Sequence, residues 1–274
     1  MEPRGAICIL KVIKIPIKIE KIMQFTFLMA VHKKHEYLAM AIESVFNQTD
    51  CNFKFHIVAN GCTDELWSYL QSLHDSRLKI FRSKIAQLSY SLNYGLESID
   101  GGYVLRIDAD DICLPDRLKI TRKLLKEFDY PDVLAGSALI INENGNNTGK
   151  FFSPQSHNAI VKSLWHRNGI LHPACAIKLE SIIRLRGYSG GFMSEDYDLW
   201  IRASRMDWFK FVGSKEILIK YRIHKDQVRG DILGYAEGAG YQFREFVLQR
   251  KIKYLVGAFF SFAKSLFKIK IWLD

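Results

Sequence analysis

Short apolar runs alternate with segments of helical periodicity through the first half of the chain. The runs are FTFLMAV, FKFHIVA, LKIF and YVLRI, which begin at Phe25, Phe53, Leu78 and Tyr103. Between them lie segments such as residues 36–48, EYLAMAIESVFNQ, in which apolar residues recur every three or four positions. This order predicts an α/β fold with a mostly parallel, Rossmann-like sheet and helices on both faces, because each crossover helix must pack back onto the sheet.

The pattern changes after Asp132. Residues 132–152 predict a strand, an Asn/Gly turn and a returning strand. Residues 171–177 predict another short strand, residues 194–206 a helix with acidic residues in its first turn, and residues 216–224 a late strand. The second half is therefore expected to extend the same sheet rather than to repeat the strand–helix alternation of the first half.

The net charge of +10 is concentrated at the two ends of the chain. Residues 1–23 carry +3 and residues 244–274 carry +5, so the 220 residues between them carry only +2. A basic groove across the fold is not indicated, which argues against a nucleic-acid partner. The five cysteines are scattered without a CxxC pair, which argues against a disulfide framework or a structural zinc site and is typical of a reducing compartment.

Residues 1–23 form an expected N-terminal extension. The segment ICILKVIKIPIKIEKIM is apolar, but a lysine interrupts it every three or four residues. It therefore lacks the unbroken apolar stretch and the cleavage site of a signal peptide. Two interpretations stay open: an arm that is flexible or touches a membrane, or an upstream start codon with Met23 as the true beginning.

Residues 233–274 are expected to form a basic amphipathic helical region after a domain at residues 24–232. On a helix, spacings of three and four residues align one narrow polar stripe, made of Arg250, Lys253, Gly257, Ser261, Lys264 and Lys268. The longest uncharged run, residues 254–263, is too short to span a bilayer. A helix that lies in a membrane interface is expected. The alternative is a helix packed on the domain, with a lysine edge that faces water.

Three aspartates, Asp108, Asp110 and Asp111, lie within four residues where an apolar strand ends. Ligands bind beyond the carboxyl ends of strands in sheets of this kind, and the turn at Asn60 also follows a strand. Clustered carboxylates repel one another unless a cation lies between them, and oxygen ligands suit Mg²⁺ or Mn²⁺. The cluster therefore indicates a metal-bound nucleotide-diphosphate site, with helix capping ahead of Pro115 as the alternative.

A second acidic pair, Glu195 and Asp196, opens the helix expected at residues 194–206. If this pair shares a crevice with the aspartates, one group can hold the metal and a leaving diphosphate while the other acts as general base toward an incoming hydroxyl. The alternative is a helix N-terminus at which the helix dipole favours acidic residues. His172, which precedes Pro173, could contact an acceptor or be structural.

Seven segments, taken in order, make the chain from about Gln24 to Gln227 resemble the family 2 glycosyltransferases, which have the GT-A fold. The segments are FTFLMAVHKKHEYLAMAIESVFNQT, IVANGCTD, LNYGL, GGYVLRIDADDICLPDRL, HPACAI, GGFMSEDYDLWIRA and YRIHKDQV. The resemblance implies an inverting, metal-dependent enzyme of the hexosyltransferase type, which moves a sugar from a nucleotide-diphosphate donor to a hydroxyl of a saccharide acceptor. Its nearest counterparts are bacterial enzymes of lipopolysaccharide, lipooligosaccharide, O-antigen and capsule synthesis.

The resemblance also implies roles for individual residues. The residues implied to bind the nucleotide-sugar are Ala30, Val31, Glu36, Asn60, Asn93, Asp108, Asp110, Arg222 and His224. Asp108, Asp110 and Asp111 are the implied ligands of Mn²⁺ or Mg²⁺. Asp196 is the implied catalytic base, with Glu195 supporting it or contacting the acceptor.

Two departures from the family pattern concern the donor. Ala59-Asn60-Gly61-Cys62 stands where the family often has Asp-Asp-Gly-Ser. An asparagine can still hydrogen-bond a uracil edge, so UDP is the expected nucleotide. Val31-His32-Lys33 replaces the family's Val-Tyr-Asn, so the usual asparagine has no counterpart.

The leading interpretation is a peripheral enzyme on the cytoplasmic, inner face of a bacterial membrane, with a lipid-linked saccharide as acceptor and membrane contact through the C-terminal helix. One alternative is a metal-dependent nucleotidyltransferase, which would normally have a glycine-rich phosphate loop after the first strand. Residues 31–34, Val-His-Lys-Lys, contain no glycine. Another alternative is a non-catalytic sugar- or membrane-binding module, which would be expected to lack the acidic pairs.

Overall fold

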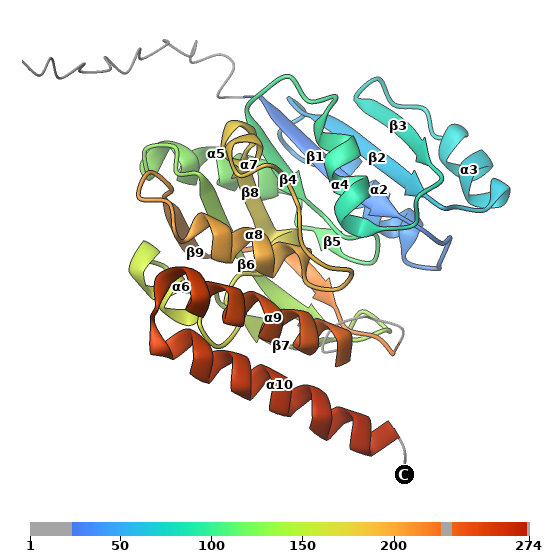
Figure 1. Cartoon of the computed structure of the whole chain (residues 1–274). Coiled ribbons are helices and arrows are strands. Elements are labelled where there is room, and N and C mark those ends of the chain that lie inside the picture. The colour runs from blue at the N-terminus through green and yellow to red at the C-terminus, as the bar shows by residue number, and fades with distance from the viewer. Residues whose placement is uncertain (1–23, 226–231, 273–274) are drawn as a thin grey trace, which may run out of the picture.

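The computed structural model describes residues 24–225 and 232–272, and within them one nine-stranded sheet carries helices on both faces (Figure 1). The strand order is β3-β2-β1-β4-β8-β6-β9-β5, and β7 pairs with β6 off this path. The strands are β1 (Phe25–Val31), β2 (Lys54–Asn60), β3 (Leu78–Ser83), β4 (Tyr103–Arg106), β5 (Ile112–Cys113), β6 (Val133–Ile141), β7 (Asn147–Phe151), β8 (Cys175–Lys178) and β9 (Phe211–Arg222). The helices are α2 (Leu38–Phe46), α3 (Asp64–Gln71), α4 (Leu88–Leu96), α5 (Arg117–Glu127), α6 (His157–Ser163), the 3-10 turn η1 (His172–Ala174), α7 (Leu179–Arg184), α8 (Glu195–Ala203), α9 (Ile232–Gln249) and α10 (Ile252–Trp272). The predicted N-terminal extension, residues 1–23, lies outside the described residues.

The first four strands form the parallel half that the apolar runs predict. β1 pairs with β2 and β4, and β2 pairs with β3, all in parallel. Phe27 of β1 lies beside Phe55 of β2 and Leu105 of β4, so the register matches apolar residues across the sheet. The prediction of an α/β fold with a mostly parallel sheet is confirmed.

The second half of the sheet is mixed. β8 inserts antiparallel between β4 and β6, although β6 and β7 precede it in the chain. β6 and β7 form the predicted hairpin, β6 also pairs in parallel with β9, and the two-residue β5 pairs antiparallel with β9. This topology places η1 and β8 beside β4, the strand that leads to the three aspartates.

Alternate residues of the central strands enter two separate apolar layers. Phe27 and Met29 of β1 pack with α2, α3 and α5, whereas Leu28 packs with α4, α7 and α8. All three side chains are fully buried. Because both faces of the strand are covered, its sequence is a continuous apolar run rather than an alternation of apolar and polar residues. Gly95 lets α4 approach the sheet closely, since a Cβ atom there would lie 2.5 Å from Cδ1 of Leu28.

The C-terminal region is a pair of helices, α9 and α10, that pack side by side (Figure 1) and are separated by a left-handed residue, Arg250, with φ 55°. The middle of the expected polar stripe packs inward. A Cβ atom at Gly257 would lie 1.9 Å from the carbonyl oxygen of Trp165, and Oγ of Ser261 donates to Oε1 of Gln242 at 2.9 Å. The stripe therefore does not face water along its whole length, because the small residues at these positions permit close helix packing.

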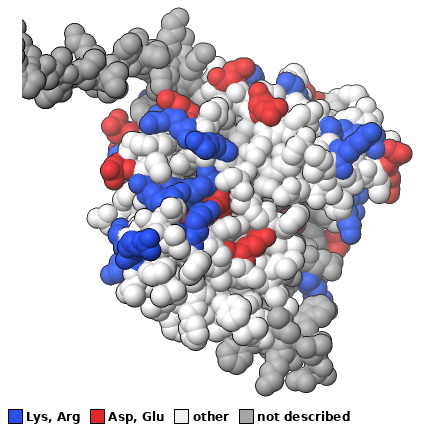
Figure 2. Space-filling model, in the orientation of Figure 1, with Lys and Arg blue, Asp and Glu red and all other residues white. Residues whose placement is uncertain are grey.

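Apolar side chains take the outward face of these two helices instead. The exposed ones are Leu233, Phe243, Val247 and Leu248 on α9, and Ile252, Leu255, Val256, Phe259, Phe260, Phe262 and Leu266 on α10. Figure 2 shows few charged side chains over this part of the molecule. Among the described helices, none combines the length and the hydropathy needed to cross a bilayer.

Candidate active site

A cavity of about 920 Å³ lies where the ends of the parallel strands, the start of α8 and the two C-terminal helices meet. The strand side contributes His32, Asn60, Asp108, Asp110 and His224, and α8 contributes Glu195 and Asp196. The C-terminal helices contribute Tyr235, Gln242, Ser261 and Lys264. The volume is in the range of small-molecule sites. The C-terminal helices are therefore part of the cavity wall.

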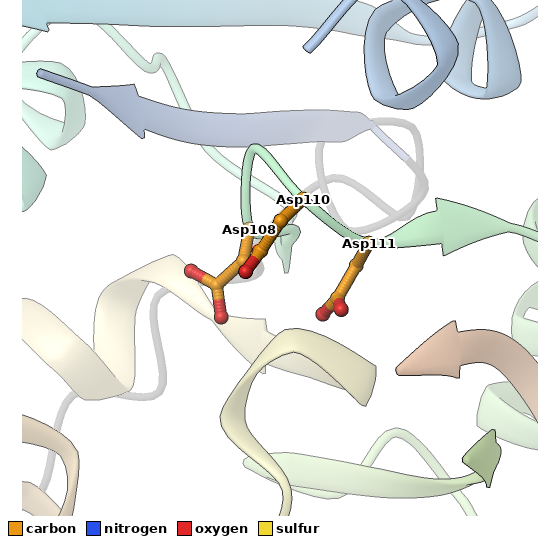
Figure 3. A group of neighbouring side chains, drawn as sticks. All are labelled: Asp108, Asp110 and Asp111. Carbon is orange, nitrogen blue, oxygen red and sulfur yellow. The ribbon is translucent and has the colours of Figure 1, made fainter. Parts of the chain in front are cut away.

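The three aspartates come from the turn that follows β4. The amide of Asp111 donates to the carbonyl of Asp108 at 3.3 Å, and Figure 3 shows the three carboxylates on the same side of the chain. One oxygen from each carboxylate lies within 4.8 Å of the others. Oδ2 of Asp110 also lies 2.9 Å from Nε2 of His224, which follows β9. The β4 and β9 ends are thus joined at one cluster.

Burial makes the negative charges of this cluster costly. It raises the pKa of Asp111 well above the ordinary value, and the carboxylates of Asp108 and Asp110 raise it further. Burial also raises the pKa of Asp108, although the guanidinium of Arg106 contacts that carboxylate and opposes the shift. A cation among the carboxylates would relieve both the burial of charge and the repulsion.

Asp111 supplies a second sign that the cluster suits a cation. Its Oδ1 accepts the backbone N–H of Arg222 at 2.9 Å, whereas its Oδ2 is buried without a partner among the described residues. Buried polar atoms normally have partners. Three carboxylates of this kind are a suitable ligand set for Mg²⁺ or Mn²⁺. The residues present therefore fit the divalent ion that the sequence predicts.

Glu195 and Asp196 open α8 and line the same cavity. Burial, followed by the charge of Asp196, raises the pKa of Glu195 to about 8. Burial raises the pKa of Asp196 to about 6, and the hydrogen bond from Nδ2 of Asn168 to its Oδ2, at 2.7 Å, opposes this shift. The two carboxyls titrate together, and Glu195 is the one favoured to hold a proton near neutral pH. Asp196 is then the ionised carboxylate available as a base.

A chain of buried polar groups supports Glu195. Nδ1 of His172 lies 3.7 Å from Oε1 of Glu195, and Nε2 of His172 lies 2.9 Å from the hydroxyl of Tyr188. Burial, followed by the charge of Arg106, lowers the pKa of His172 well below the ordinary value, so the ring is neutral. His172 lines the cavity and also belongs to this series of buried polar groups. Its position is therefore compatible with both roles considered for it, contact with an acceptor and structural support.

A carboxylate of α9 holds the loop that leads into α8. Glu237 accepts the backbone N–H groups of Phe192, at 2.6 Å, and Met193, at 3.1 Å, and also the hydroxyl of Ser194, at 2.8 Å. Gly191 allows this approach, because a Cβ atom there would lie 2.1 Å from Oε2 of Glu237. The position of the acidic pair thus depends on α9.

We expect Glu237→Ala to lower the free energy of unfolding by about 1–3 kcal/mol, because three donors lose a charged acceptor. The exchange of the amide hydrogens of residues 192–194 should become faster. Chemical denaturation and hydrogen–deuterium exchange measure the two effects. Glu216→Ala, which removes an exposed carboxylate of β9, is the control and should change neither. Unchanged exchange at residues 192–194 in Glu237→Ala would contradict the role of α9.

Half of the residues predicted for the site line the cavity, namely Asn60, Asp108, Asp110, Glu195, Asp196 and His224. Asp111 lies directly beneath them. Oδ1 of Asn60 is buried and has no partner among the described residues, so it is available to a ligand at the end of β2.

The other predicted residues lie outside the cavity lining. Ala30 and Val31 pack into the two apolar layers of the sheet, and Glu36 is exposed just before α2. The amide of Asn93 bonds both backbone groups of Tyr188, at 2.8 and 2.9 Å, so it fixes the loop before α8. The guanidinium of Arg222 donates to backbone carbonyls, including that of Asp110 at 3.0 Å. Asn93 and Arg222 therefore hold loops beside the site, and their contacts with the donor stay a prediction.

Several cavity residues were not foreseen, among them His32, His35, Asn168, Gln242 and Lys264. Asn168 lies four residues before His172 in a segment that the sequence analysis read only for its strand. Gln242 and Lys264 belong to helices that were read as a separate region. Nothing in their spacing ties them to the aspartates, because the tertiary packing of α9 and α10 brings them there.

Comparisons with known proteins bear on the family. The model described as Glycosyl transferase family 2 matches residues 26–185. The O-antigen biosynthesis glycosyltransferase WbnJ of Escherichia coli is 37% identical over 247 residues, which cover 88% of this chain and 96% of that protein. The UDP-Gal:alpha-D-GlcNAc-diphosphoundecaprenol beta-1,3-galactosyltransferase of Escherichia coli is 29% identical over 211 residues, which cover 75% of this chain and 76% of that protein.

Solved structures bear on the fold. S. aureus TarS 1-349 in complex with UDP-GlcNAc has a TM-score of 0.66 at 14% identity, with 82% of this chain and 66% of that chain covered. The mannosyltransferase PcManGT from Pyrobaculum calidifontis, in complex with GDP-Man and Mn²⁺, has a TM-score of 0.60 at 13% identity, with 88% of this chain and 72% of that chain covered. The predicted GT-A fold class is confirmed.

Proposed function

Because the chain belongs to glycosyl transferase family 2, we propose that it is an inverting enzyme that moves a sugar from a UDP-linked donor to a hydroxyl of a saccharide acceptor. The observation that carries this proposal is the meeting of two acidic groups, residues 108–111 and 195–196, in one cavity. We also propose that the product is a bacterial surface polysaccharide, because the relative WbnJ acts in O-antigen biosynthesis.

On the donor side, Asp108, Asp110 and Asp111 would hold a divalent ion, which when bound neutralises charge on a leaving diphosphate. His224, beside Asp110, is placed to donate to a phosphate oxygen. Asn60 offers its unpartnered amide oxygen to an N–H group of the base. TarS, which has a related fold, binds UDP-GlcNAc, and PcManGT binds GDP-Man with Mn²⁺. The affinities for UDP and GDP are therefore the first quantities to measure.

On the acceptor side, Asp196 accepts the proton of the attacking hydroxyl. The hydrogen bond from Asn168 orients this carboxylate and favours its ionised form. Glu195, which holds a proton near neutral pH, can donate a hydrogen bond to the acceptor or to its neighbour. A base on α8 and a leaving group held at the aspartate cluster suit a single displacement with inversion, in which no covalent nucleophile is needed. Positioning and electrostatic stabilisation would then supply most of the rate.

The outward apolar face of α9 and α10 supports contact with a membrane surface. Exposed apolar side chains such as Phe259, at 68% exposure, and Ile252, at 69%, lie beside lysines of the same helix. Such a surface binds in the headgroup region without crossing the bilayer. The name of one relative, the diphosphoundecaprenol galactosyltransferase, indicates a lipid-linked saccharide as its substrate. We propose an acceptor of this kind here, which would meet the cavity from the membrane side.

The function is tested by calorimetric titration of UDP and GDP into the wild-type protein, with and without Mn²⁺. We expect UDP to bind in the presence of Mn²⁺ and to bind more weakly after chelation. A preference for GDP would contradict the UDP assignment and leave the transferase in place. No metal-dependent binding of either nucleotide would contradict the proposed function itself.

A further inference from the structure

Three basic side chains gather at the part of the cavity that α10 borders. His166 and Arg167 follow α6, and Lys264 belongs to α10. All three line the cavity and are exposed at its mouth. We call these three residues the basic rim. They come from segments that are about a hundred residues apart in the chain, so their meeting is a product of the fold.

The packing of the C-terminal helices fixes the loop that carries two of these residues. Nε2 of Gln242 on α9 donates to the carbonyl of Trp165 at 3.0 Å, and the glycine at position 257 lets α10 lie against the same carbonyl. Ser261 in turn donates to Gln242 at 2.9 Å, one turn before Lys264. The rim is therefore held by hydrogen bonds directly behind it.

The charges of the basic rim are not neutralised within the described chain. None of the ion pairs among residues 24–225 and 232–266 joins Arg167 or Lys264 to a carboxylate. Burial lowers the pKa of His166, and the positive charges of Arg167 and Lys264 lower it further. Lys264 also lies over the ring of Tyr235 at 5.9 Å. An anionic ligand would supply the missing counter-charge.

The surface beside the rim is apolar. Leu255, Val256, Phe259 and Phe260 are exposed on α10, and their spacing of three and four residues places them along one side of the helix. One turn further on, Lys264 marks the point where this apolar side reaches the cavity mouth. A ligand that fits this surface would carry an anionic group next to an apolar chain.

We propose that the basic rim binds the diphosphate group of an amphiphilic acceptor, in which a saccharide is joined through diphosphate to a lipid. The lipid chain lies along the apolar side of α10, and the saccharide reaches Asp196 through the cavity. This inference rests on the proposed function and deepens it, because it assigns residues to the acceptor. The donor diphosphate is assigned separately, to the aspartates after β4 and to His224.

The test uses farnesyl diphosphate as the probe, in the presence of saturating UDP and Mn²⁺ so that the donor site is filled. The double variant Arg167→Gln/Lys264→Gln is compared with the wild type by calorimetry. We expect its affinity for the probe to fall by about tenfold or more, because charge-assisted hydrogen bonds are lost. Lys162→Gln/Lys251→Gln, which removes two exposed positive charges outside the cavity lining, should retain the wild-type affinity.

Two outcomes would overturn the inference. One is equal affinity of the wild type and the rim variant for farnesyl diphosphate. The other is wild-type binding of inorganic diphosphate as tight as that of farnesyl diphosphate, because the lipid chain would then contribute nothing. Titration of UDP with Mn²⁺ into the same proteins separates this failure from that of the proposed function, since the rim variant should bind UDP as the wild type does.

Discussion

Asp196→Asn is expected to lower the rate of sugar transfer by about 10²–10⁴-fold, the range of a lost general base. The amide cannot accept the proton of the acceptor hydroxyl, although its oxygen can still accept the hydrogen bond from Asn168. The affinity for UDP and Mn²⁺ should stay near that of the wild type, because Asp196 belongs to α8 and is not one of the three clustered aspartates. Steady-state kinetics and calorimetry measure the two quantities.

Glu195→Gln is the matched control. The carboxyl of Glu195 is buried and holds its proton near neutral pH, so a neutral amide of the same shape resembles its working form. We expect a much smaller loss of transfer than in Asp196→Asn. If Glu195→Gln lost more of the transfer rate than Asp196→Asn, Glu195 rather than Asp196 would be the base.

The pH dependence of transfer is a second test of Asp196 as the general base. A base must be ionised, and burial raises the pKa of Asp196 to about 6, so the rate should fall as pH falls through about 6. An ordinary aspartate would show this fall at a lower pH. Asn168→Ala removes a hydrogen bond that lowers this pKa, so its acid limb should move to higher pH. An unmoved limb would show that Asp196 is not the titrating base.

The parallel half of the fold can be predicted from the sequence because three of its strands, β1, β2 and β4, are buried on both faces. Runs such as residues 25–31 then carry no polar alternation and end at turn residues, which makes them easy to read. The same logic placed Asn60 and Asp108 at strand ends and therefore at one edge of the sheet. β5 is a different case, since two residues give no periodicity and its pairing with β9 depends on the tertiary fold.

Asn93 and Arg222 show that residue type alone does not reveal the partners of a side chain. Both were assigned to nucleotide-sugar binding through the family resemblance, and both use their side chains on backbone groups of loops that carry the site. A polar residue that holds a loop and one that touches a ligand look alike in sequence. Only the partners of the side chain distinguish them.

The C-terminal helices show a second limit. The spacing of glycine, serine and lysine in this segment predicts one polar stripe but does not say what that stripe faces. Close packing at Gly257 and Ser261 turns the small residues inward and leaves Phe259 and its apolar neighbours outside. Periodicity gives the faces of a helix, and packing decides which face is covered.

Removal of divalent metal by a chelator is expected to lower the melting temperature of the wild-type protein, and Asp110→Asn is expected to abolish most of this effect. An ion that binds only the folded state adds stability, by about 2.7 kcal/mol when its free concentration is 100 times its Kd. Asp110 faces the cavity beside His224 and contributes one of three clustered carboxylate oxygens. The Mn²⁺-dependent affinity of the Asp110→Asn variant for UDP should also fall, by about 10–100-fold.

Asp111→Asn and Asp116→Asn make this test specific. In the presence of the chelator, Asp111→Asn should melt above the wild type, because it removes a fully buried carboxyl whose ionised form repels Asp108 and Asp110, while its oxygen can still accept from the amide of Arg222. Asp116 lies outside the cluster, where it accepts a hydrogen bond from Thr49, so its variant should keep the wild-type response to Mn²⁺. A wild type that is indifferent to Mn²⁺, together with an Asp111→Asn variant that melts below it, would mean that the carboxylates stabilise the fold by themselves. If Mn²⁺ stabilises the wild type and Asp111→Asn melts above it in the chelator, the carboxylates lower the stability of the metal-free fold and serve to hold a cation. Such a loss of stability is common at functional sites.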